Sequence, residues 1–191
     1  MEQTILSLCL GVGLAAACGF RIFVPLLVMN LAARADYLEL SGSFSWIAST
    51  PALIVLAAAT VLEIGAYYIP WLDHVLDAAA APIAVVAGVI AAASVFTGVD
   101  PMLKWALAVI AGGGAAGAVH GATSLVRGVS TVTTGGLGNF VVSTGEAVSA
   151  VLLSLATIVL GPLLALGLLA VALLLAVRWV RSRRTVAAAT A

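Results

Sequence analysis

The sequence predicts an all-α integral membrane protein, a bundle of five or six transmembrane helical segments in which the first segment is broken. Of its 191 residues, 63% are hydrophobic and 8% are charged, against roughly 45–50% and 25% in soluble domains. Apolar runs long enough to cross a bilayer follow one another along the chain. We therefore expect one transmembrane domain over residues 1–184, embedded in a lipid bilayer, and a short disordered tail over 185–191.

The charges of the chain balance to zero with histidine neutral, which leaves no basic surface for nucleic acid. Four of the eight basic residues nevertheless gather after the last apolar run: Arg178, Arg181, Arg183 and Arg184. Clusters of this kind stay on the cytoplasmic side of a membrane. We expect a multi-pass protein of a bacterial inner membrane, with its C-terminus in the cytoplasm.

The first apolar run is too long for one straight crossing. At about 29 residues it would span roughly 43 Å as a helix, against a hydrocarbon core of about 30 Å. Gly19 and Pro25 lie in its middle, with Arg21 between them. We predict a helix over 6–18, a break from Gly19 to Pro25 and a second helical piece over 26–34. The sequence leaves open whether the break is a kink or the tip of a re-entrant hairpin.

A loop and a second membrane helix follow. The predicted loop over 36–49 carries the aromatic residues that suit the headgroup level of a membrane, namely Tyr37, Phe44 and Trp46. Thr50 and Pro51 then have the character of an N-cap and a first helical position. The helix that they open is predicted to run to about residue 68, just before Pro70.

Two further helices are predicted in the middle of the chain. A short polar connector over 73–77 precedes a third helix, which begins near Pro82 and ends near Thr97. Asp100 and Pro101 form another N-cap and first position. They predict a fourth helix that ends at about residue 127.

Three glycines repeat every four residues in the fourth predicted helix: Gly113, Gly117 and Gly121. This spacing lets another helix approach backbone to backbone. The partner is either a helix of the same bundle or a second copy of the chain, and the latter predicts a homo-oligomer.

The last part of the chain is a Gly-, Ser- and Thr-rich predicted loop over 128–138 and an apolar run over 139–180. At about 42 residues, that run is too long for one crossing. Gly161-Pro162 divides it into two helices or one sharply bent one. Six segments would place both termini on the same side, while the short joint keeps five crossings open.

Ionisable groups inside a membrane cost about 2.5–3.5 kcal/mol at the centre of a helix, so each calls for a reason. Four stand out within the predicted segments, namely Arg21, Glu63, His120 and Glu146, and Arg127 sits at a helix end, where it could reach the interface. Buried opposite charges usually pair, and we predict that Arg21 pairs with Glu63 and Arg127 with Glu146. Such pairs either fix the register of the helices or stand on a transport pathway.

Two predicted helices carry polar stripes. At 100° per residue, one face of the fifth segment holds Ser143, Glu146, Ser149, Ser154 and Thr157. His120, Thr123, Ser124 and Arg127 share a face of the fourth segment in the same way. Facing stripes would either line a wet path or hold helices together through hydrogen bonds.

The connector brings together two carboxylates and a histidine. Asp73 and Asp77 lie four residues apart, so a helical turn would place both on one face with His74 alongside. This set would bind a divalent cation or form a solvated turn at the membrane interface. It falls short of the ligands that a structural metal cage needs.

Three stretches resemble motifs of a bacterial membrane family, the domain of unknown function 4126. They are residues 19–27 (Gly-Phe-Arg-Ile-Phe-Val-Pro-Leu-Leu), 69–77 (Ile-Pro-Trp-Leu-Asp-His-Val-Leu-Asp) and 139–146, which ends in Glu146. The resemblance covers residues 11–184. It implies a bacterial inner-membrane protein with Arg21, Asp73, Asp77 and Glu146 in its motifs. Ala147 stands where the family tends to have a second acid, and this argues against a two-carboxylate mechanism there.

Three functions are consistent with these patterns. The first is a small channel or transporter for a small ion, proton or small solute, with Arg21, Glu63, His120, Arg127 and Glu146 along its path. The second is a membrane-embedded enzyme that acts on a lipid or isoprenoid headgroup with a divalent cation at Asp73 and Asp77. The third is a non-catalytic scaffold or partner subunit in which every charge is structural.

Overall fold

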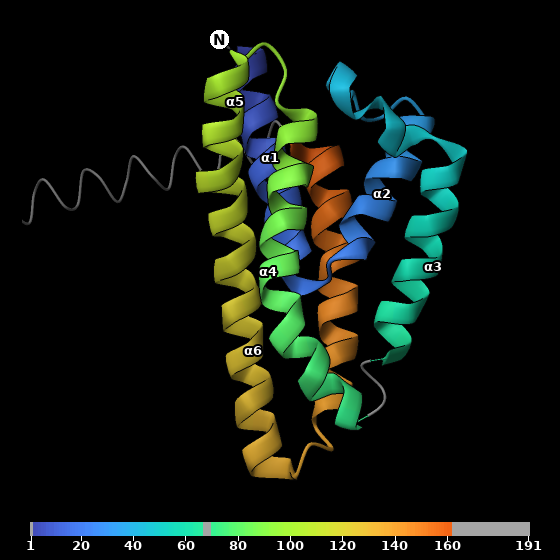
Figure 1. The fold of residues 1–191 in the computed structure, drawn as a ribbon, viewed down its shortest axis with the longest axis vertical. Coiled ribbons are helices and arrows are strands. Elements are labelled where there is room, and N and C mark those ends of the chain that lie inside the picture. The colour runs from blue at the N-terminus through green and yellow to red at the C-terminus, as the bar shows by residue number, and fades with distance from the viewer. Residues whose placement is uncertain (1, 67–69, 162–191) are drawn as a thin grey trace, which may run out of the picture.

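The chain folds into a bundle of helices in the computed structural model (Figure 1). The structure describes residues 2–66 and 70–161, with the side chains of 4–66 and 79–161, and all regular secondary structure in them is helical. The elements are α1 (Glu2–Phe20), α2 (Phe23–Arg34), the 3-10 helix η1 (Gly42–Ala48), α3 (Thr50–Ala66), α4 (Pro70–Val95), α5 (Pro101–Leu107), the π-helix η2 (Ala108–Gly113), α6 (Gly114–Thr134) and a last helix, Asn139–Gly161.

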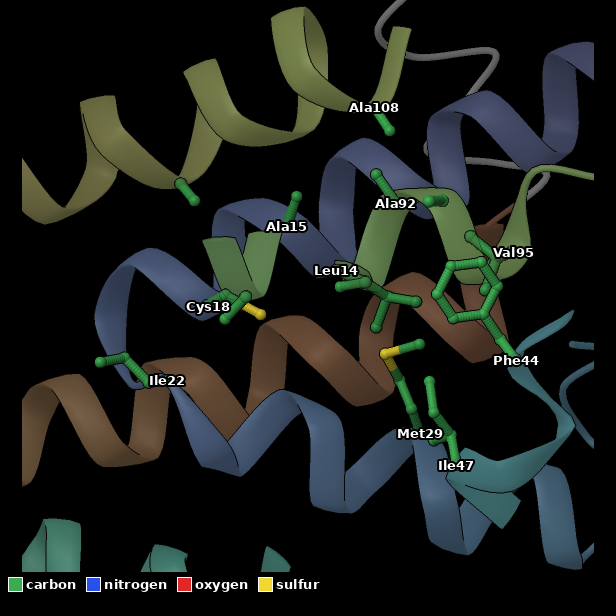
Figure 2. Packing of buried hydrophobic residues seen from close by; sticks show 14 of the residues in the cluster. Leu14, Ala15, Cys18, Ile22, Met29, Phe44, Ile47, Ala92, Val95 and Ala108 are labelled. Carbon is green, nitrogen blue, oxygen red and sulfur yellow. The ribbon is translucent and has the colours of Figure 1, made fainter. Parts of the chain in front are cut away.

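The first segment is a hairpin and not a kinked helix. α1 runs from the N-terminal end of the bundle towards its middle, the chain reverses, and α2 returns towards the same end (Figures 1 and 2). The predicted break from Gly19 to Pro25 is too wide, because only Arg21 and Ile22 are outside the two helices. Pro25 lies in the first turn of α2, where a missing N–H breaks no hydrogen bond.

Two helices of the described chain are long and apolar enough to cross a membrane. They are the continuous helix of α5, η2 and α6, which spans Pro101–Thr134, and the Asn139–Gly161 helix. A third is possible if η1 and α3, which are bent by 63° at their junction, are counted as one span. These lengths are compatible with a membrane protein. The division at Gly161-Pro162 and the arginine cluster lie at or beyond the end of the described residues.

α4 runs without interruption from Pro70 to Val95 and passes through Pro82. The predicted polar connector over 73–77 and the predicted helix start at Pro82 are therefore wrong. A proline inside a helix removes one backbone hydrogen bond and costs about 3 kcal/mol. The alanines that precede Pro82 are the best helix formers, and α4 packs extensively on α1 and α6, which offsets that cost.

The caps of the helices explain two further differences. Ser49 precedes α3 and its Oγ accepts the Ala52 N–H at 3.2 Å, so the cap is Ser49 and not Thr50. Asp100 caps α5 as predicted, since its carboxylate accepts the N–H groups of Met102 and Leu103 at 2.9 and 3.4 Å.

α6 is longer than the sequence predicted. It continues through the first half of the predicted 128–138 loop and ends at Thr134. The Thr134 hydroxyl donates to the Ser130 carbonyl at 2.7 Å and accepts the Gly138 N–H at 2.8 Å. Gly135 follows with φ 64°, the left-handed conformation typical of a helix C-cap. The polar composition of this stretch thus forms a helix end and a tight turn.

The polarity of the bundle is inverted relative to a soluble protein. Leu62, Ile110 and Leu125 are each more than 70% exposed, whereas Arg21 is 1% exposed. The buried apolar core consists of small and medium side chains where α1, α2 and α4 meet, with Leu14, Cys18 and Met29 at its centre (Figure 2). Apolar side chains on the outside are stable when the surrounding solvent is lipid.

Glycines allow the central helices to pack closely. A Cβ added at Gly112 would lie 2.9 Å from the Gly88 carbonyl oxygen, so α4 and η2 meet nearly backbone to backbone. Of the predicted glycine stripe, Gly113 and Gly117 face valines of α4, and Gly121 faces open space. Two of the three glycines therefore serve packing within the chain, and the homo-oligomer stays a prediction.

Candidate functional site

Arg21 lies at the tip of the hairpin with its side chain fully buried. Its Nη2 donates to the backbone carbonyl of Ser143 at 2.9 Å and also to the Ser143 hydroxyl. The same nitrogen is 3.3 Å from Oε2 of Glu146. The reversal of the chain at residues 21–22 thus inserts a guanidinium into the first turns of the Asn139–Gly161 helix.

Glu146 receives a second guanidinium from α6. Arg127 Nε donates to Glu146 Oε1 at 3.0 Å, and Arg127 Nη2 donates to Oε2. Both side chains are 4% exposed. The predicted pair of Arg127 with Glu146 is present, in the bidentate geometry that makes arginine–carboxylate contacts strong. One carboxylate therefore joins the hairpin, α6 and the last described helix.

Glu63 has a different role from the predicted one. Its two carboxylate oxygens accept the backbone N–H groups of Ile22 and Phe23 at 2.7 and 3.0 Å. These amides open α2, and a carboxylate is stabilised at a helix N-terminus by free N–H groups and the helix dipole. The prediction that Arg21 pairs with Glu63 is corrected, because the arginine points to Glu146 while Glu63 binds the backbone beside it.

The polar face of α6 packs against the hairpin. His120 and Thr123 are buried there, and Ser124 Oγ lies 3.5 Å from His120 Nε2. A Cβ added at Gly19 would lie 2.5 Å from the Ala116 carbonyl oxygen and 3.0 Å from the His120 amide nitrogen. Only glycine permits this approach, which places the hairpin tip against α6.

The polar stripe of the Asn139–Gly161 helix faces inwards. Ser143, Ser154 and Thr157 are buried, and Ser149 is half-buried. Thr157 packs directly on the backbone of α1, because a Cβ added at Gly13 would lie 2.6 Å from Thr157 Cγ2. This part of the stripe therefore contributes to close helix packing.

Two apolar pockets open on either side of the hairpin tip. One, of about 310 Å³, lies between α2, α3 and α4 and is lined by Ile22, Phe23 and Glu63. The other, of about 390 Å³, lies between α6 and the last described helix and is lined by Phe20 and Glu146. The hairpin tip, defined here as Phe20 to Phe23, thus separates two pockets, each with one carboxylate at its wall.

The predicted cation site cannot be placed. The side chains of Asp73, His74 and Asp77 lie outside the described residues. In the part of the chain whose side chains are described, no group of three His, Cys, Asp or Glu residues is arranged to hold a metal ion.

Several buried polar residues were missed by the sequence analysis, among them Asn30 and Lys104. Asn30 of α2 is fully buried and donates from Nδ2 to the Ile47 carbonyl and, at 3.2 Å, to the Ser49 carbonyl. Lys104 of α5 is 9% exposed. Each is an isolated polar residue within an apolar stretch, and that was the available signal.

A comparison with known sequence families assigns the chain. Residues 8–182 match the family described as domain of unknown function (DUF4126). The chain belongs to this family. The match includes all three motif stretches, and the structure brings the first and third DUF4126 motifs into contact through Arg21, Ser143 and Glu146. No curated protein and no solved structure matches the chain significantly.

Proposed function

We propose that this DUF4126 protein is a small membrane channel or transporter for a small ion, a proton or a small solute, and that its pathway passes the hairpin tip. The observation that carries the proposal is the position of the tip. It is a break in a helix, buried within the bundle, with Arg21 inserted between two pockets.

Both the break and its charges are of a kind found in transport proteins. Non-helical backbone at membrane depth is tolerated where it is buried in protein or lines a cavity. Transporters place such broken helices at their binding sites, where helix ends and buried charges meet the substrate. Here the N–H groups at the N-terminus of α2 bind Glu63, and Arg21, the residue just before them, contacts Glu146.

The packing restricts the route. Thr157 packs closely on Gly13, which disfavours a route along the polar stripe at that level. A route between the two pockets around Phe20 and Phe23 involves apolar side chains and the two carboxylates. We propose that movement of the tip opens this route, with Arg21 and Arg127 holding it closed through Glu146.

The location of the protein is part of the proposal. The arginines near the C-terminus favour a multi-pass protein of the bacterial inner membrane with a cytoplasmic C-terminus. A homo-oligomer through the exposed part of the Gly113, Gly117 and Gly121 face is compatible with the open space at Gly121.

A non-catalytic scaffold is the second candidate, and one observation favours it. The carboxylates of the site are bound within the chain, Glu146 by two arginines and Glu63 by two backbone amides. Such a network would fix the positions of the helices without transporting any ion or solute. The metal-dependent lipid enzyme stays a prediction that rests on the sequence of the 69–77 motif.

Flux through liposomes tests the proposal, with two matched glycine variants. Gly145 lines the pocket beside Glu146, and Gly114 lies outside it as the first residue of α6. A Cβ meets nothing within 4 Å at either position, so Gly145→Leu and Gly114→Leu should both fold. We would measure proton, monovalent cation and halide flux with dyes enclosed in liposomes that contain the wild type or either variant.

Transport past the tip predicts that Gly145→Leu lowers the flux at least about tenfold, while Gly114→Leu leaves it near the wild-type value. Glu146→Gln weakens the contacts with Arg21 and Arg127 that hold the route closed, so it should raise the flux in protein that elutes as the wild type does. Equal flux in both glycine variants would place the route elsewhere. Absence of flux in the wild type for every ion tested would favour the scaffold.

A further inference from the structure

A second polar site lies at the N-terminal end of the bundle, away from the hairpin tip. Lys104 is the single lysine of the chain and sits in the first turn of the Pro101–Thr134 helix. It is 9% exposed. Its Nζ donates to Ser41 Oγ at 2.6 Å and lies 5.0 Å from the centre of the Phe44 ring. Among the described residues, no carboxylate forms an ion pair with it.

The Lys104 ammonium has unused donors that could bind an anion. Lysine has three donors, and one of them is used by Ser41. A cation–π contact offsets only part of the free energy that it costs to remove an ammonium group from water. The hydroxyl and the ring therefore leave Lys104 with donors for an anionic group in the pocket beside Nζ.

The space for such a group exists. A pocket of about 580 Å³ adjoins Lys104, and its wall includes Glu39, Ser41, Thr97 and Trp105. The wall is held in place, because the Ser41 N–H donates to the Ser94 carbonyl of α4 at 2.7 Å. Phe44 and Trp105 pack with ring centroids 6.0 Å apart. The pocket therefore combines one cation, one carboxylate and an aromatic side.

Its position matches the headgroup level of a membrane. Lys104 is near the start of a helix long enough to span a bilayer. Three exposed aromatic residues lie in the same loops and helix start as the pocket: Tyr37, Trp46 and Trp105. Tryptophan and tyrosine are enriched at membrane–water interfaces, where their polar and apolar parts are both satisfied.

We propose that this pocket binds the headgroup of a zwitterionic phospholipid that carries a primary amine. The lipid phosphate contacts the Lys104 ammonium, and the lipid ammonium contacts the Glu39 carboxylate. An anionic lipid without an amine would satisfy Lys104 but would bring its charge next to Glu39. The site thus selects a headgroup with both charges, independently of transport at the hairpin tip.

The single lysine makes a direct test possible. Purified full-length protein in a neutral detergent is treated with an amine-reactive reagent, and modification of Lys104 is followed by mass spectrometry of its peptide. Initial rates are compared at equal concentrations of each addition, and ethanolamine controls for the reagent that the lipid's own primary amine consumes. Short-chain phosphatidylethanolamine should slow the modification of Lys104 at least about tenfold relative to ethanolamine, and phosphatidylglycerol and inorganic phosphate should slow it much less. This measurement needs no variant.

Variants test the two contacts separately by lipid binding in native mass spectrometry. Lys104→Gln should weaken phosphatidylethanolamine binding at least about tenfold. Arg34→Gln, which removes an exposed cation at the end of α2 that bonds to Ala48 and Thr50 and does not line the pocket, should leave it unchanged. Glu39→Gln should remove the preference for phosphatidylethanolamine over phosphatidylglycerol.

Three results would overturn the proposal. Inorganic phosphate that protects Lys104 as well as the lipid does would make this a site for a free anion. Equal protection by phosphatidylglycerol in the wild type would remove the role of Glu39. Unchanged lipid binding in folded Lys104→Gln would place the lipid elsewhere on the surface.

Discussion

Replacing Glu63 by alanine should loosen the hairpin tip. The substitution removes two hydrogen bonds, at 2.7 and 3.0 Å, between a carboxylate and the N–H groups that open α2. Hydrogen bonds to a charged group are worth about 1.5–3 kcal/mol each. The two together give an upper value of roughly 3–6 kcal/mol, from which water or a neighbouring group recovers a part. We expect a loss of about 2–3 kcal/mol in the stability of the tip.

The buried thiol of Cys18 reports on this loss. Cys18 is fully buried in the last turn of α1, three residues before Arg21 (Figure 2). In a Cys9→Ser background it is the only cysteine of the chain. If Glu63→Ala lowers the free energy of local opening by about 2–3 kcal/mol, the population of the open state rises roughly 30- to 150-fold, because 1.4 kcal/mol corresponds to a factor of ten. The labelling rate of Cys18 should rise by that factor.

Two further variants complete the test. Glu63→Gln retains one acceptor oxygen, so its labelling rate should lie between those of the wild type and Glu63→Ala. Glu39→Ala removes an exposed carboxylate and should leave the rate unchanged. A labelling rate in Glu63→Ala equal to that of the wild type would refute the argument that this carboxylate holds the tip.

Two more predictions concern the packing of the tip. Gly19→Ala adds a Cβ 2.5 Å from the Ala116 carbonyl oxygen, so thermal unfolding should show a loss of about 1–3 kcal/mol in stability. Gly121→Ala adds a Cβ in open space and should gain up to about 1 kcal/mol in stability from helix propensity. A loss of the same size in both variants would contradict the close approach at Gly19. Arg127→Met breaks a buried pair with Glu146 and should cost about 3–5 kcal/mol in detergent unfolding. The double variant Arg127→Met, Glu146→Leu should lose less stability than the sum of the losses in the two single variants. Strict additivity would show that the two side chains do not interact.

Several features of this fold were predictable because they are local. Asp100 followed by proline predicted a helix start, and the carboxylate does cap that helix. The apolar runs predicted helices, and the described chain is helical. The length of the first run, together with Gly19 and Pro25, predicted a break near Arg21, and the chain reverses there.

Other predictions failed where tertiary contacts outweigh local preference. Pro82 was expected to start a helix, yet α4 passes through it, because packing on α1 and α6 stabilises the longer helix. The glycine- and threonine-rich stretch after residue 127 was expected to be a loop. Its threonine hydroxyls instead bond to carbonyls one turn earlier and finish α6.

The partners of the charges show the same limit most clearly. The sequence placed Arg21, Glu63, Arg127 and Glu146 in the membrane segments, but the distance along the chain did not say which would meet. Arg21 contacts Ser143, 122 residues later, because the hairpin turns its tip towards the last described helix. Glu63 was expected to need a cation, whereas the free amides of a helix N-terminus satisfy it.

The sequence by itself determined that the chain is helical and apolar enough for a membrane, that it belongs to the DUF4126 family, and which few polar residues lie within its apolar segments. Composition and local hydrogen bonding settle these properties, and both can be read along the chain. Only the tertiary structure decided that the first segment is a hairpin, that Glu146 joins two arginines, and that Lys104 is buried without a carboxylate partner among the described residues. These depend on which helix faces meet, and the side chains of helices distant in sequence settle that together.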